Sequence, residues 1–164
     1  LNVGAMLLAF IALIALVNYL LTGLGDLTGL NGVLQGAYGR PLSLELLFGL
    51  IFQFLAFGIG VPWADALNFG SLIGSKIVLN EFVAYLDLSR MISSNMLTSD
   101  KSVFMAAFAL CGFANFSSIA IQIGGISPLA PERRKDLAAL GLKAVLGGTL
   151  ANLSAAAVAG IFFG

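Results

Sequence analysis

Four long stretches of this 164-residue chain contain no aspartate, glutamate, lysine or arginine: residues 1–25, 46–64, 102–131 and 144–164. Each stretch has about the 20 residues that an α-helix needs to cross the hydrocarbon core of a bilayer. Charged residues make up only 10% of the chain, whereas about 25% is usual in a soluble domain. The sequence therefore predicts an all-α integral membrane protein.

The charge-free stretches and the breaks between them predict four transmembrane helices and one helix at the membrane surface. We expect the spans at about residues 2–23, 44–61, 102–125 and 137–163. Between the first two spans, residues 26–40 carry an apolar stripe at helical spacing among polar side chains, which is typical of an interfacial helix. The sequence also starts with a leucine inside an apolar run, so we expect it to be the later part of a longer membrane protein.

Residues 64–92 do not fit a complete membrane span. Their two apolar pieces, 66–75 and 77–88, are each too short to cross a bilayer and meet at a Gly-Ser-Lys sequence, residues 74–76. Two half-length helices joined by a turn are typical of a re-entrant hairpin, which is tolerated only where protein or a water-filled cavity surrounds its backbone. We therefore predict a re-entrant helical hairpin that turns at residues 74–76.

Two ionisable residues of this segment, Lys76 and Glu81, indicate a functional site, because a charge at membrane depth is costly. The Glu81 carboxylate could accept hydrogen bonds from the hydroxyl groups of a polar ligand or carry a coupling proton. The alternative is a structural ion pair between Glu81 and Lys76. Lys76 could instead extend its side chain toward the membrane surface or neutralise local charge.

A polar stripe interrupts the predicted span at residues 102–125. Asn115, Ser118 and Gln122 recur at spacings of three and four residues, which places them on one face of a discontinuous helix. Such a stripe can join neighbouring helices, or it can line a site of the kind in which secondary transporters hold substrate and coupling ion. In the same break Phe113 could stack on a flat ligand or simply pack against its neighbours.

Several classes of protein are excluded or disfavoured by composition. The chain has no histidine and a single cysteine, which excludes Ser–His and Cys–His catalysis and a disulfide framework. No spacing of cysteines or carboxylates suggests a metal site, and eight basic residues balance eight acidic ones, so no net field favours nucleic acid. An enzyme with Glu81 as general base would need a nucleophile, metal or cofactor motif that the sequence lacks. A channel with the hairpin as its filter is a remaining alternative.

The only basic cluster of the chain predicts its orientation in the membrane. Arg133, Arg134 and Lys135 lie in a short connection before the last span. Positive charge in short loops favours the cytoplasmic side. We therefore expect this loop in the cytoplasm and the C-terminus outside.

Three segments of the chain resemble one family of membrane proteins. Residues 74–85, GSKIVLNEFVAY, resemble the signature G-x-K-x-x-x-N-E-F-V-A-Y of concentrative nucleoside transporters. Residues 111–125, CGFANFSSIAIQIGG, are similar to the next conserved segment of that family, as are residues 131–134, PERR, with the following span. The resemblance covers essentially the whole chain and indicates the C-terminal half of such a transporter.

This resemblance implies secondary active transport of nucleosides across the inner (cytoplasmic) membrane by cation symport, and no enzymatic activity. The family forms homotrimers in which each protomer has its own substrate site between two re-entrant hairpins and two broken helices. A substrate-holding part moves like an elevator against a trimeric scaffold. The implied coupling ion is sodium, with a proton as the alternative, and no cofactor is implied.

The resemblance also assigns roles to individual residues. It implies that Glu81, Asn115 and Ser118 bind the ribose hydroxyls and that Phe113 lies close to the ligand. Further candidates for supporting roles in the site are Asn80, Lys76 and Gln122. The residues that bind sodium and those that read the base belong to the N-terminal half of the family, which is absent here, so no metal ligands are expected in this chain. The sequence does not distinguish purine from pyrimidine preference.

Overall fold

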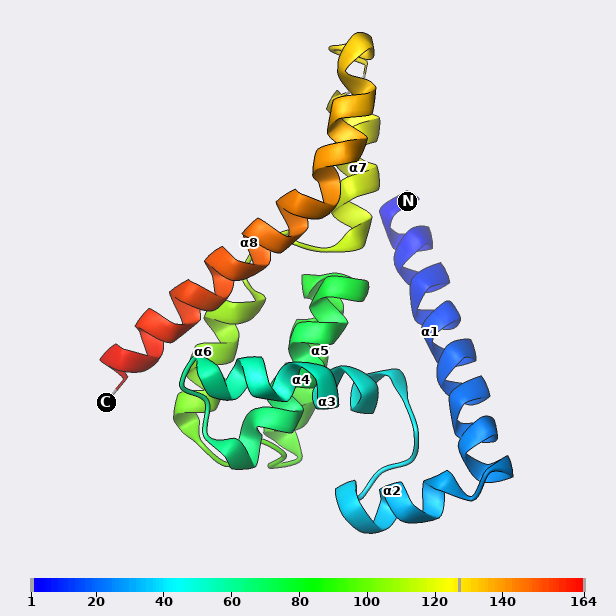
Figure 1. The fold of residues 1–164 in the computed structure, drawn as a ribbon, viewed down its shortest axis with the longest axis vertical. Coiled ribbons are helices and arrows are strands. Elements are labelled where there is room, and N and C mark those ends of the chain that lie inside the picture. The colour runs from blue at the N-terminus through cyan, green and yellow to red at the C-terminus, as the bar shows by residue number, and fades with distance from the viewer. Residues whose placement is uncertain (1, 127, 164) are drawn as a thin grey trace. The chain divides into compact units, whose positions relative to one another are not determined.

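The computed structural model describes residues 2–126 and 128–163, and these form helices and connecting loops without any strand. The all-α fold predicted from the sequence is confirmed (Figure 1). The elements are α1 (Asn2–Leu27), α2 (Leu30–Tyr38), α3 (Leu44–Gly58), α4 (Trp63–Val78), α5 (Glu81–Ser93), α6 (Asp100–Leu110), α7 (Phe116–Ile126), a single 3₁₀ turn η1 (Pro131–Arg133) and α8 (Arg134–Phe162).

The chain divides into two compact units, one ending at Phe48 and the other beginning at Gly49, so that the boundary falls within α3. In the first unit an asparagine of α1 holds the start of α3. The Asn18 side chain donates from Nδ2 to both carboxylate oxygens of Glu45 at 3.0 Å, and its Oδ1 accepts from the Leu44 N–H at 2.8 Å. This single amide therefore ties α1 to the first turn of α3, which Ser43 also caps by accepting from the Leu46 N–H at 3.2 Å.

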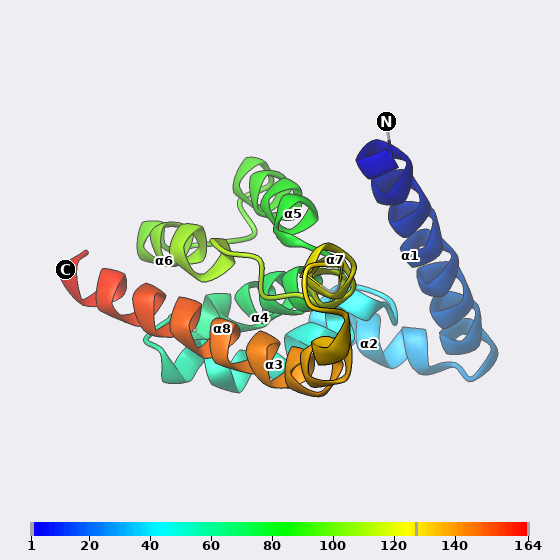
Figure 2. The same ribbon diagram turned by 90° about the horizontal axis from the view of Figure 1, so that it is seen from above.

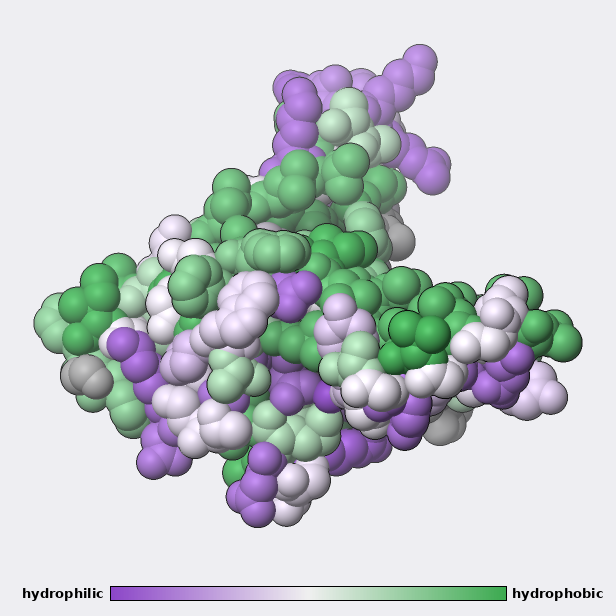
Figure 3. All heavy atoms as spheres, turned by 60° about the horizontal axis from the view of Figure 1, so that its bottom comes forward, coloured by the Kyte–Doolittle hydropathy of each residue, from purple (hydrophilic) through white to green (hydrophobic). Residues whose placement is uncertain are grey.

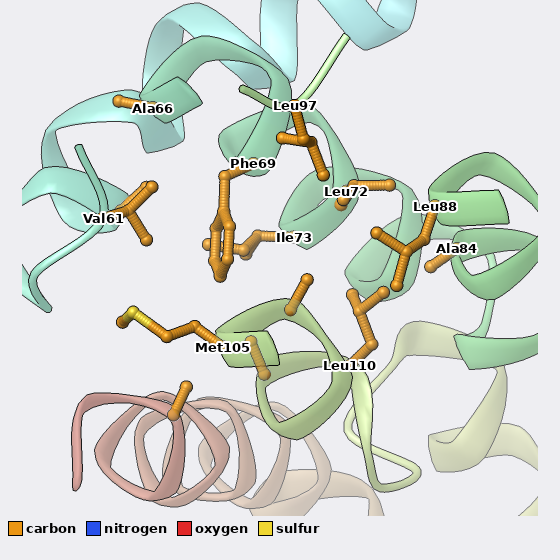
Figure 4. Packing of buried hydrophobic residues seen from close by; sticks show 14 of the residues in the cluster. Val61, Ala66, Phe69, Leu72, Ile73, Ala84, Leu88, Leu97, Met105 and Leu110 are labelled. Carbon is orange, nitrogen blue, oxygen red and sulfur yellow. The ribbon is translucent and has the colours of Figure 1, made fainter. Parts of the chain in front are cut away.

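The second unit has an apolar core built from α4, α5, α6 and α8. Figure 4 shows Phe69 and Ile73 projecting from α4 toward α6, where Met105 is fully buried. A glycine of α8, Gly160, lets this helix approach Met105 closely, because a Cβ atom there would lie 2.6 Å from the Met105 sulfur. The buried cluster includes Ala66, Phe69, Leu72, Ile73, Ala84, Leu88, Met91, Met105, Ala109, Leu110, Leu153 and Ala156.

Helices α4 and α5 form a helical hairpin, but its turn is not where the sequence suggested. The predicted turn at residues 74–76 is wrong, because α4 continues through these residues to Val78 and the break consists of Leu79 and Asn80. The small buried residues at 74 and 75 allow the helix to continue against its neighbours. Asn80 starts the next helix: its backbone is extended, and its Oδ1 accepts from the Val83 N–H at 3.0 Å.

Within the described residues, one helical stretch is long and apolar enough to cross a membrane on its own, Pro131–Phe162. Two further pairs of consecutive helices, with α1 counted only from Ala12, reach this length together. Ala12–Leu27 and Leu30–Tyr38 are bent by 107°, and Leu44–Gly58 and Trp63–Val78 by 119°. Each bent pair has the form of a broken span or a re-entrant loop, and the positions of the spans in a membrane stay predictions.

Helices α6 and α8 pack along each other in the second unit (Figure 2). Between α6 and α7 lies a non-helical stretch, residues 111–115, as the predicted discontinuous helix requires. The connection from α7 to α8 forms a projecting end with hydrophilic side chains (Figure 3), and residues 132–136 are exposed there.

The contact between α3 and α4 depends on glycine. A Cβ atom built on Gly70 would lie 2.8 Å from the Gln53 backbone nitrogen and 2.9 Å from the Gly49 carbonyl oxygen. We expect Gly70→Ala to lower the free energy of unfolding by about 1–3 kcal/mol, because backbone atoms must separate to admit the methyl group. The measurement is thermal unfolding in detergent, and the control is Gly58→Ala, whose Cβ would meet nothing within 4 Å. Equal stability of the two variants would contradict the prediction.

Candidate functional site

Two helices, α5 and α7, begin immediately after a break, and an asparagine precedes each of them. Asn80 caps α5 through its bond from the Val83 N–H. Asn115 occupies the equivalent position before α7, where its Oδ1 accepts from the Ser118 N–H at 2.8 Å. Asparagine is favoured here because its side-chain oxygen replaces an acceptor that the first turn of a helix lacks. Each helix start also carries the positive end of the helix dipole.

Hydrogen bonds join the two helix starts across the breaks: the Ser117 hydroxyl donates to the Leu79 carbonyl oxygen at 3.4 Å, and a side-chain amide reaches Glu81. The Asn115 Nδ2 donates to the Glu81 Oε2 at 3.1 Å. Asn115 is only 1% exposed, and its Oδ1 also accepts from the hydroxyl groups of Ser117 and Ser118 at 2.7 and 2.8 Å. Glu81 is the first residue of α5 and is partly exposed. A carboxylate therefore lies at the starts of both helices, where the helix dipoles favour negative charge.

The Glu81 carboxylate keeps the capacity to accept further hydrogen bonds. A carboxylate has two oxygens with about four acceptor positions. Among the residues that the structure describes, Asn115 is the one side chain that donates to it. Lys76 and Glu81 do not form the alternative structural ion pair, since the salt bridges found in the described regions are Arg90–Asp87 and Arg133–Asp136. The arrangement can thus receive hydroxyl donors from a ligand.

A cavity of about 350 Å³ lies between the α6–α7 break, α7 and α8. Three of the predicted site residues line it: Phe113, Ser118 and Gln122. Phe113 is 75% exposed, and Gln122 is exposed as well. The spacing suggested that Asn115 and Gln122 share a helix face. They do not, because Asn115 precedes the helix and its side chain bonds to Glu81. Ser118 connects the cavity to the Asn115–Glu81 pair, since it lines the cavity and its hydroxyl donates to Asn115.

Lys76 is buried, with only 2% of its surface exposed, and it bonds to the main chain. Its Nζ donates to the Ala109 carbonyl oxygen at 2.9 Å. This carbonyl belongs to the last turn of α6, where carbonyl groups lack partners within the helix. A positive charge is favourable at a helix C-terminus. Lys76 therefore stabilises the end of α6 and does not extend to the surface.

A second buried charge, Asp65, was not recognised in the sequence. Asp65 is 0% exposed, and its Oδ1 accepts from the Thr98 N–H and hydroxyl at 2.8 and 2.9 Å. Its Oδ2 accepts from the Ser99 N–H at 3.1 Å. Because Ser99 is the residue before α6, Asp65 joins the first turn of α4 to the start of α6. The available signal was an aspartate in a first turn, where the helix dipole favours a negative charge.

Comparison with known protein families gives an extensive match. Residues 1–160 match the model of the Na⁺-dependent nucleoside transporter C-terminus. The chain is 57% identical over 162 residues to the uncharacterized transporter YutK of Bacillus subtilis, covering 99% of this chain and 37% of YutK. It is 45% identical over 166 residues to the nucleoside permease NupC of Helicobacter pylori, covering 100% of this chain and 38% of NupC. The rat sodium/nucleoside cotransporter 1 is 38% identical over 99% of this chain and 26% of its own length.

Solved structures agree with these sequence matches. CNTnw in an inward-facing substrate-bound state superposes with a TM-score of 0.85 at 47% identity, covering 98% of this chain and 37% of that protein. The chain thus spans less than two fifths of the relatives that it matches. The matched relatives with named activities are transporters and permeases, which is consistent with a protein that is not an enzyme. By sequence and by fold, the chain belongs to the concentrative nucleoside transporter family and corresponds to its C-terminal region.

Proposed function

We propose that this chain forms the C-terminal part of a secondary active transporter that takes up nucleosides across the cytoplasmic membrane together with sodium. The observation that carries the proposal is the hydrogen bond from Asn115 to Glu81 across two helix breaks. Relatives named as a nucleoside permease and as sodium/nucleoside cotransporters support the substrate and the ion.

The chemistry of the pair suits the ribose of a nucleoside. Neighbouring ribose hydroxyls donate two hydrogen bonds in one direction, and the Glu81 carboxylate can accept both. Asn115 and Ser118 would bind the same hydroxyl groups, and Phe113 would contact the ligand from the neighbouring cavity. Gln122 supports that cavity from α7, while Asn80 and Lys76 support the site through the hairpin.

In the membrane, we place α4 and α5 as a re-entrant hairpin with its tip at Leu79 and Asn80. Helices α6 and α7 then form the discontinuous span, and α8 forms the last span, with Arg133–Lys135 in the cytoplasm and the C-terminus outside. The complete protein would assemble as a homotrimer and move its substrate site like an elevator. The sodium ligands and base-reading residues would lie in the N-terminal half of that protein.

Sodium coupling is tested by ion replacement in cells that express the complete transporter carrying this sequence. We expect accumulation of radiolabelled uridine to fall to the background of cells without the transporter when choline replaces sodium at constant pH, because symport needs the coupling ion. Unchanged uptake in choline that is lost with a protonophore would instead identify proton coupling. Uptake that neither saturates nor exceeds the external concentration would identify a channel and overturn the proposal of active transport.

A further inference from the structure

The hairpin tip that carries Glu81 is attached to the end of α6 by both of its arms. From α4, Lys76 donates to the Ala109 carbonyl at 2.9 Å. From α5, the Tyr85 hydroxyl donates to the Ala107 carbonyl at 2.7 Å. Lys76 and Tyr85 thus flank Glu81 in the sequence, and both bond within one turn of the same helix.

The acceptors at the end of α6 are a defined set. The last four carbonyl groups of a helix have no partner within it, and in α6 these include Ala107, Phe108 and Ala109. The Phe108 carbonyl accepts from the Cys111 N–H at 3.2 Å, so Lys76 and Tyr85 bond to the two carbonyls on either side. Directly beyond this turn the chain enters the break that ends at Asn115. The positions of both Glu81 and Asn115 therefore depend on the end of α6: the hairpin that carries Glu81 bonds to it, and the break that ends at Asn115 begins there.

The opposite ends of the two helices are joined as well, and the spacings match. Asp65 and Lys76 are separated by the same number of residues as their partners Thr98 and Ala109. The two ends of α4 are thus tied to the corresponding ends of α6, the first by Asp65 to the residues just before α6 and the second by Lys76 to its last turn. Asp65 lies at the N-terminal ends and Lys76 at the C-terminal ends, so both charges also complement the helix dipoles.

We propose that Lys76 and Tyr85 are positioning residues that set the Glu81 carboxylate at the correct distance from Asn115 for ribose. Neither residue contacts the ligand. Each acts through the hairpin tip, which it fixes against the last turn of α6. This inference rests on the proposed function, in which Glu81 accepts hydrogen bonds from the ribose hydroxyls.

The test uses Tyr85→Phe in the complete transporter, since this change removes a single hydroxyl group. The wild type is expected to bind uridine more tightly than 2′,3′-dideoxyuridine, which lacks the two hydroxyl groups that would donate hydrogen bonds to Glu81. In Tyr85→Phe we expect the uridine Kd to rise about three- to tenfold, the effect of one lost hydrogen bond, and the dideoxyuridine Kd to stay unchanged. Tyr38→Phe in α2 is the matched control and should change neither value. Calorimetry on purified protein gives both constants.

Lys76→Met supplies a second measurement, because methionine replaces most of the apolar part of the lysine side chain and lacks its terminal donor. We expect the same selective loss of uridine affinity. A merely structural role would instead weaken both ligands alike, and that result, or full retention of uridine preference in Tyr85→Phe, would overturn the inference. If the wild type itself does not prefer uridine over dideoxyuridine, the ribose-binding role of Glu81 fails, which is a failure of the proposed function.

Discussion

Replacement of Glu81 by glutamine in the complete transporter is expected to abolish concentrative uptake of uridine while the protein still reaches the membrane as a trimer. Glutamine preserves the shape and can still bond to Asn115 through its oxygen. It removes the charge, however, and presents an amide donor where the ligand also donates. Hydrogen bonds to a charged group contribute about 1.5–3 kcal/mol each, so the loss of two lowers affinity by about two orders of magnitude or more.

The measurement for Glu81→Gln is the steady-state accumulation of radiolabelled uridine, with surface expression and oligomeric state determined in parallel. Glu132→Gln is a matched control, because it makes the same chemical change at an exposed glutamate. The control should accumulate uridine like the wild type. Wild-type accumulation by Glu81→Gln would rule out this carboxylate as a ribose ligand.

The largest expected effect on stability is that of Asp65→Ala. The substitution removes three hydrogen bonds from Thr98 and Ser99 to a fully buried carboxylate. The two main-chain donors are then left without this partner at the start of α6. We expect the free energy of unfolding to fall by at least about 3 kcal/mol, because each hydrogen bond to a charged group contributes about 1.5–3 kcal/mol.

Denaturant or thermal unfolding of the purified transporter measures this loss. The control is Asp100→Ala, at an exposed aspartate in the first turn of α6. This control tests whether a negative charge near the positive end of the α6 dipole alone accounts for the effect. We expect the control to lose less than about 1 kcal/mol. A similar loss in both variants would show that the bonds from Asp65 do not hold α4 to α6.

Glu81 and Asn115 were selected as candidate site residues because few polar side chains occur within such apolar sequence. The structure brings these two side chains together, and their role in ligand binding stays a prediction. The position of the hairpin turn was predicted wrongly, because glycine and serine at positions 74 and 75 were interpreted as residues that end the helix. In a closely packed helix, small residues allow close approach and the helix continues. Asn80, followed by Glu81 in the first turn, is the stronger boundary signal.

The partners of Lys76 could not be predicted from any pattern of side chains. Its acceptor is a main-chain carbonyl 33 residues away in the sequence, and every residue supplies such a group. The partners of Asp65 could not be predicted for the same reason, because they include main-chain N–H groups, which nearly every residue supplies. Helical periodicity therefore indicates which residues share a face, whereas it gives no information on which helix end a long polar side chain reaches.

This use of main-chain acceptors has a consequence for evolution. The bonds from Lys76 and Tyr85 depend on side chains at one end only, because Ala107 and Ala109 contribute their backbone carbonyls. Selection for these contacts would constrain positions 76 and 85, while positions 107 and 109 would be free to vary as far as the bonds are concerned. Correlated substitutions should therefore be absent between positions 76 and 85 on the hairpin and positions 107 and 109 on α6, although both hairpin helices contact α6 there.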